Sequence, residues 1–91
     1  MEINNICKRA VDTFGPEHQT MKAVEEMGEL MAALVQYNDG RVSSEDVMTE
    51  IADVMIMMEQ LAFIFDPRFV GLEYNRKISR LKSILEDEQE R

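Results

Sequence analysis

Two pairs of acidic residues, each with a spacing of three positions, are the part of this sequence best suited to chemistry. Glu26 and Glu29 form the first pair, with Glu25 directly beside them. Glu50 and Asp53 form the second pair. In an α-helix, residues three positions apart are separated by about 60° around the axis and about 4.5 Å along it, so their carboxylates can converge. Each pair is therefore a candidate for binding a cation.

The second pair lies in an apolar setting. The same face of the expected helix contains aliphatic and thioether side chains: Val47, Val54, Met57, Leu61 and Ile64. An ionised carboxylate in such surroundings must protonate, pair with a base or coordinate a metal, because leaving it unpaired is costly. No Lys or Arg occurs between Arg41 and Arg68. The compensating charge must therefore come from another helix, another subunit or an ion.

Three interruptions divide the chain into four expected helices, and no strand-like alternation of apolar and polar residues persists. The interruptions are Gly15-Pro16, Asn38-Asp39-Gly40 and Asp66-Pro67. They predict helices over about residues 2–13, 17–38, 44–65 and 67–88. We therefore expect an all-α antiparallel bundle of about four helices, with its core completed by oligomerisation. It forms a single domain over residues 1–91, in which the acidic tail 86–91 frays.

A short loop joins the second and third expected helices, so they should pack as an antiparallel hairpin. Ser43 is the expected N-cap of the third helix. The hairpin brings Glu26 and Glu29 opposite Glu50 and Asp53. Four carboxylates without histidine form an all-oxygen site that suits Mg²⁺, with Mn²⁺ as a substitute. Because magnesium sites of this kind usually bind substrate phosphates, the implied substrate is a phosphorylated small molecule.

Composition and charge argue against several other kinds of ligand and partner. The 91 residues carry a formal net charge of −8, and such a surface repels nucleic acid polymers. A zinc site cannot be built from the single Cys7 and the single His18. The single Cys7 also cannot form an intrachain disulfide, so we expect a cytoplasmic location. The apolar stretch 51–65 is interrupted by acids and too short to span a bilayer, so we expect no membrane role. The third helix is apolar on nearly all sides, which favours a subunit interface.

The two acidic motifs together resemble the MazG-like and dimeric dUTPase group of all-α nucleotide pyrophosphohydrolases. The mark of that group is Glu-Glu-x-x-Glu, a spacer, then Glu-x-x-Asp. This chain has Glu25-Glu26-Met27-Gly28-Glu29, twenty intervening residues, and Glu50-Ile51-Ala52-Asp53. The resemblance covers about residues 10 to 85. It implies hydrolysis of a nucleoside triphosphate to a nucleoside monophosphate and pyrophosphate, by water attack at the α-phosphate.

The resemblance also implies roles for individual residues. Mg²⁺ would be held by Glu26, Glu29, Glu50 and Asp53. The catalytic acids would be Glu25, Glu26 and Glu29, with Glu25 orienting water or supporting the ligands. Dimers or dimers of dimers, with cores built by helices from two chains, are also typical of the group.

Three further residues are candidates for substrate binding. Lys77 and Arg80 belong to a basic stretch similar to one that follows the acidic motif in this family, and they are equally well read as surface cations or partners of Glu73. Gln19, with His18 beside it, corresponds to positions near the base-binding pocket of relatives. His18 is also readily explained as a first-turn residue facing water.

Gly28 lies inside a helix, where glycine costs about 1 kcal/mol relative to alanine, and this suggests close approach of another backbone or of substrate. The main alternative to an enzyme is an acidic helical adaptor that binds a partner protein through its Met-rich face. A family member that binds nucleotides without turnover is a third reading, and the presence of every expected acid argues against it.

Overall fold

The computed structural model describes residues 3–89, and its regular structure in that range is entirely helical. The helices are α1 (Ile3–Phe14), α2 (Pro16–Asn38), α3 (Ser44–Phe65) and α4 (Pro67–Gln89). Each begins and ends within one residue of the position predicted from the sequence, so the all-α class is confirmed. Of the tail expected to fray, residues 86–89 continue α4, and residues 90 and 91 lie outside the described range.

Local signals in the sequence account for the helix ends. Gly15, with φ of 93°, makes the turn between α1 and α2, and Gly40, with φ of 77°, follows the end of α2. At the start of α3 the Asp46 amide donates to Ser43 Oγ over 3.2 Å, and the Ser43 amide donates to Asp46 Oδ2 over 3.0 Å. This reciprocal pair is a capping box, which satisfies two amides that the helix leaves without partners. Ser43 is therefore the N-cap, as predicted.

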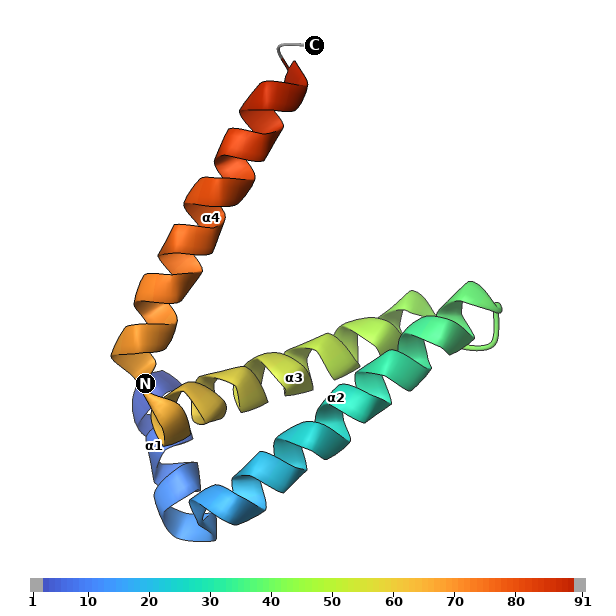
Figure 1. The fold of residues 1–91 in the computed structure, drawn as a ribbon. Coiled ribbons are helices and arrows are strands. Elements are labelled where there is room, and N and C mark those ends of the chain that lie inside the picture. Colours follow the sequence, from blue (N-terminus) through green and yellow to red (C-terminus); the bar gives the residue numbers. More distant parts are fainter. Residues whose placement is uncertain (1–2, 90–91) are drawn as a thin grey trace.

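Helices α2 and α3 form the antiparallel hairpin expected from the short loop, and α1 packs against its open end (Figure 1). The buried apolar residues are Cys7, Val11, Ala23, Ala33, Val47 and Met57. Most of them are small, and among residues 3–89 none of the large side chains is completely buried. The core of the single chain is therefore thin, in keeping with its short length.

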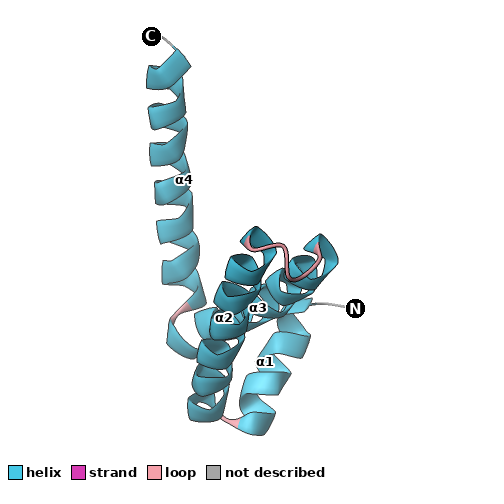
Figure 2. Cartoon of the chain, turned by 90° about the vertical axis from the view of Figure 1, so that its right-hand side faces the viewer, coloured by secondary structure: helices cyan, strands magenta, loops and turns pink. Residues whose placement is uncertain are grey.

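Helix α4 leaves this three-helix body as a separate arm (Figures 1 and 2). Its first turn is capped by Asp66 Oδ1, which accepts hydrogen bonds from the amides of Arg68 and Phe69, both over 3.1 Å. Beyond the junction it packs on no other helix of the chain, and none of its residues is buried. Within one chain the bundle is thus made by α1, α2 and α3.

Within residues 3–89, no helix combines the length and the apolar character needed to cross a membrane.

Candidate metal centre

The hairpin brings together three of the four acids expected to hold a metal. One carboxylate oxygen from each of Glu26, Glu29 and Glu50 lies within 4.8 Å of the other two. Glu26 and Glu29 come from α2 and Glu50 comes from α3, so the group depends on the packing of two helices. Glu26 and Glu50 are half-buried, whereas Glu29 is exposed. The spacing of three residues and the antiparallel connection together explain this convergence.

Two oxygens of this group are buried without a hydrogen-bond partner among the described residues. They are Glu26 Oε2 and Glu50 Oε2. The other carboxylate oxygen of Glu26, Oε1, lies 3.4 Å from Lys22 Nζ, and the Glu26 side chain is 13% exposed. Leaving a buried carboxylate oxygen unpaired costs free energy, and a cation is the ligand that best offsets this cost. The geometry and the donor chemistry therefore both fit a hard divalent ion.

The electrostatics of the group also favour an added cation. The pKa of Glu29 is raised above its ordinary value, chiefly by the negative charge of Glu26, and also by desolvation and by Glu50 and Glu25. The pKa of Lys22 is raised as well, chiefly by the charge of Glu25 and by its hydrogen bond to Glu26. The single positive charge of Lys22 does not balance the negative charges of the neighbouring glutamates. The ionised carboxylates therefore repel one another.

Asp53 and Glu25 flank the group without belonging to it. Asp53 lies one turn beyond Glu50 and is half-buried, but its carboxylate is outside the set of oxygens that lie within 4.8 Å of one another. Glu25 is exposed, and its charge contributes to the raised pKa values of both Glu29 and Lys22. Of the predicted metal ligands, the structure therefore gathers Glu26, Glu29 and Glu50 and leaves Asp53 at the edge.

Gln19 takes part in a buried polar contact between α2 and α3. Its Nε2 donates to Gln60 Oε1 over 2.7 Å, and its Oε1 lies 2.7 Å from His18 Nδ1. Gln60 Nε2 in turn donates to Met57 Sδ over 3.9 Å. Gln19 and Gln60 are only 5% and 4% exposed. The contact fixes the register of the two helices that carry the acidic group. Gln60 was not predicted from the sequence, although an amide within the mostly apolar stretch 51–65 is a usable signal.

Replacing Gln60 by Ala should therefore reduce the free energy of unfolding by about 1–3 kcal/mol, because it leaves the buried Gln19 amide without its acceptor. Gln36→Ala is a suitable control, since Gln36 is half-buried on α2 and makes no side-chain hydrogen bond. The double variant with Leu at positions 19 and 60 should recover most of the loss, because both polar partners are then removed. Urea denaturation measures all three. A Gln60→Ala loss equal to that of the control would contradict the contact.

The cations of α4 do not reach the acidic group of their own chain. Arg76 binds Glu73, with Nε and Nη2 at 3.0 and 2.8 Å from Glu73 Oε2, and this pairing lowers the Glu73 pKa. Arg76 is thus the partner of Glu73, a role the sequence left open to Lys77 and Arg80. Those two residues are exposed on the arm that projects from the hairpin (Figures 1 and 2).

Gly28 makes no close contact within the chain. A Cβ atom added at this position would meet nothing within 4 Å. The close approach that we expected from a glycine inside a helix is therefore not made by another part of the same chain.

No family model, curated protein or solved structure matched the chain. The resemblance to MazG-like enzymes accordingly rests on the spacing of the acidic residues.

Proposed function

We propose that this chain is a Mg²⁺-dependent nucleoside-triphosphate pyrophosphohydrolase, and that Mn²⁺ can replace Mg²⁺. The observation that carries the proposal is the pair of buried, unpartnered oxygens, Glu26 Oε2 and Glu50 Oε2. They belong to two side chains that each place a carboxylate oxygen within 4.8 Å of one from Glu29. An all-carboxylate set of this kind suits a hard divalent ion, and such ions commonly bridge acidic sites to phosphates. The resemblance of the two motifs to MazG-like enzymes supports the same reaction.

In this proposal Glu26, Glu29 and Glu50 hold the ion, and Asp53 joins them through a side-chain movement from the neighbouring turn. When bound, the ion neutralises phosphate charge and orients the reacting groups. Glu25 is exposed beside the ligands, where it can position a water molecule at the α-phosphorus. One of the carboxylates in the group accepts the proton of that water.

The remaining roles are also part of the proposal. Gln19 contacts the base side of the substrate while it supports the hairpin, and Lys77 and Arg80 contact the polyphosphate. The protein acts in the cytoplasm as a homodimer or homotetramer, without nucleic acid polymers as partners. Helix α3 favours an assembly, because Met48, Met55 and Ile56 are all at least half exposed in the single chain.

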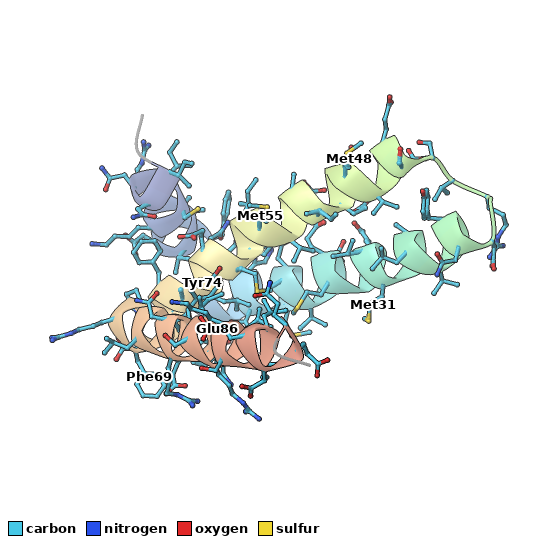
Figure 3. All side chains as sticks on the ribbon, turned by 90° about the horizontal axis from the view of Figure 1, so that it is seen from above. Met31, Met48, Met55, Phe69, Tyr74 and Glu86 are labelled. Carbon is cyan, nitrogen blue, oxygen red and sulfur yellow. The ribbon has the colours of Figure 1, made fainter. Side chains whose placement is uncertain are left out.

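A second candidate function is a protein adaptor with no turnover. The observation that favours it is the exposure of methionines on the outer faces of the hairpin. Met31, Met48 and Met55 lie on the sides of α2 and α3 that face away from each other (Figure 3). Flexible thioether side chains suit surfaces that bind varied partners. Mg²⁺ should raise the melting temperature of the enzyme but not that of such an adaptor.

The proposed reaction is tested by incubating the protein with each common NTP and dNTP in Mg²⁺ and ¹⁸O-labelled water. Pyrophosphate and orthophosphate are then quantified separately. We expect pyrophosphate from at least one nucleotide, with the label in the monophosphate, because water attacks the α-phosphorus. Chelation of Mg²⁺ should abolish release. Production of orthophosphate and nucleoside diphosphate alone would overturn the proposal, as would turnover that persists without a divalent ion.

A further inference from the structure

Helix α4 carries an apolar stripe that the rest of its chain leaves largely exposed. The stripe consists of Val70, Tyr74, Ile78, Leu81 and Leu85, with spacings of four, four, three and four. The start of the stripe, Val70 and Tyr74, lines an open cavity with residues of α3 such as Ala62 and Phe63. All five side chains are between 44% and 66% exposed. A projecting helix with one such stripe gains little of the tertiary packing from which most helices in proteins derive their stability. The arm therefore requires a covering surface from outside the chain.

Helix α2 presents a matching apolar seam on the side away from α3. Its members are Met21, Val24, Gly28, Met31 and Val35, with spacings of three, four, three and four. Figure 3 shows Met31 directed away from α3. A 3-4 spacing is typical of surfaces that pack against a second helix. Gly28 lies at the centre of the seam with open space beyond it, so a second helix can approach closely at this point.

The charges on the two surfaces are opposite. Residues 16–66, which include the hairpin, contain eleven acidic and two basic residues. Residues 67–85 of α4, which carry the stripe, contain five basic and one acidic residue, and the last turn of α4 adds Glu86, Asp87 and Glu88. The spacing of residues around an α-helix places Glu25 and Glu29 along one edge of the α2 seam. It likewise places Lys77 and Arg80 along one side of the α4 stripe. Such an arrangement favours association of the two surfaces and sets their orientation.

We infer that two copies of this chain associate reciprocally, with α4 of each copy packed along the outer seam of α2 of the other. The arm does not contact its own α2, because the extended backbone at Asp66 directs it away from the hairpin (Figure 1). Each copy thus donates one arm and receives one, which closes the assembly with two-fold symmetry. The thin core of the single chain is extended by both contacts.

This assembly has a consequence that rests on the proposed function. It brings Lys77 of the partner subunit and Arg80 of the partner subunit to the side of α2 that carries Glu25 and Glu29. The acidic group of one chain would then receive, from the second chain, the cations that its own α4 does not supply. Each phosphate-binding site would need both copies.

The first test is sedimentation of the full-length chain and two variants. Leu81→Asp places a charge in the α4 stripe, and Leu72→Asp places the same charge on the opposite side of α4. Both leucines are at least half exposed in the single chain. We expect a dimeric parent, a dissociation constant at least about tenfold higher for Leu81→Asp, and no comparable change for Leu72→Asp. A monomeric parent, or equal effects of the two variants, would overturn the inference.

The second test locates the contact and does not depend on turnover. In a Cys7→Ala background, chains carrying Ile78→Cys and chains carrying Met31→Cys are mixed and treated with a short bis-maleimide. We expect cross-linked heterodimers to dominate over both homodimers, with little product when Met48→Cys on α3 replaces Met31→Cys. Dominant Ile78→Cys homodimers would instead show pairing of the two arms and overturn the inference. Failure of pyrophosphate release with heterodimer formation would reject the proposed function alone.

Discussion

Replacement of Glu50 by Gln should lower kcat/KM for pyrophosphate release by about 1000-fold, equivalent to about 4 kcal/mol of transition-state stabilisation. The reason is that Glu50 contributes the only carboxylate from α3 to the group within 4.8 Å, and its Oε2 is buried without a partner. Gln keeps the shape of the side chain but removes its charge. Steady-state pyrophosphate release in Mg²⁺ measures the effect.

The same variant should behave differently when stability is measured. Without metal, Glu50→Gln should be at least as stable as the parent, since it removes one of the mutually repelling charges. With Mg²⁺, the parent should gain melting temperature and the variant should lose most of that gain. Glu59→Gln is the matched control, because Glu59 is an exposed acid on the same helix. Retention of the full Mg²⁺ effect by Glu50→Gln would contradict its role as a ligand.

Replacement of Asp53 by Asn is the second change with a large expected effect. Asp53 lies outside the close group although the family motif includes it. If it moves to join the ion, Asp53→Asn should lose nearly all turnover and most of the Mg²⁺-induced rise in melting temperature. The metal-free variant should be no less stable than the parent.

A surface role for Asp53 predicts neither loss, because an exposed Asp→Asn substitution usually changes stability by less than about 0.5 kcal/mol. Thermal melting of Asp53→Asn with and without millimolar Mg²⁺, alongside turnover, distinguishes the two. An unchanged metal-dependent shift would show that Asp53 is not a ligand. The site would then consist of Glu26, Glu29 and Glu50.

Much of the fold could be predicted because its determinants are local. Ser43 and Asp46 form their capping box within one turn, and Asp66 caps the helix that follows it directly. The facing of Glu26 and Glu50 also follows from local rules, since a short loop between two helices makes them antiparallel neighbours. Local sequence signals were therefore sufficient to predict the helix boundaries and, of the four acids expected at the site, the three that come together.

The features that were not predicted depend on how one helix packs against another and on the backbone angles between helices. The contact of Gln19 with Gln60 requires the register of α2 against α3, which helix periodicity alone does not provide. The direction of α4 depends on the backbone at Asp66, where φ is −170° and ψ is 101°. The exposure of its apolar side chains follows from that direction, because α4 contacts only α3 among the other helices.

The central proposal is that a metal ion binds between α2 and α3. The most direct test is to titrate the metal-free protein with Mn²⁺ and to measure the free ion by electron paramagnetic resonance. The account predicts saturable loss of the free Mn²⁺ signal with the parent, competition by Mg²⁺, and binding at least about tenfold weaker with Glu50→Gln. The exposed-acid control Glu59→Gln should bind like the parent. The absence of saturable binding, or equal binding by the parent and Glu50→Gln, would contradict a metal site between α2 and α3.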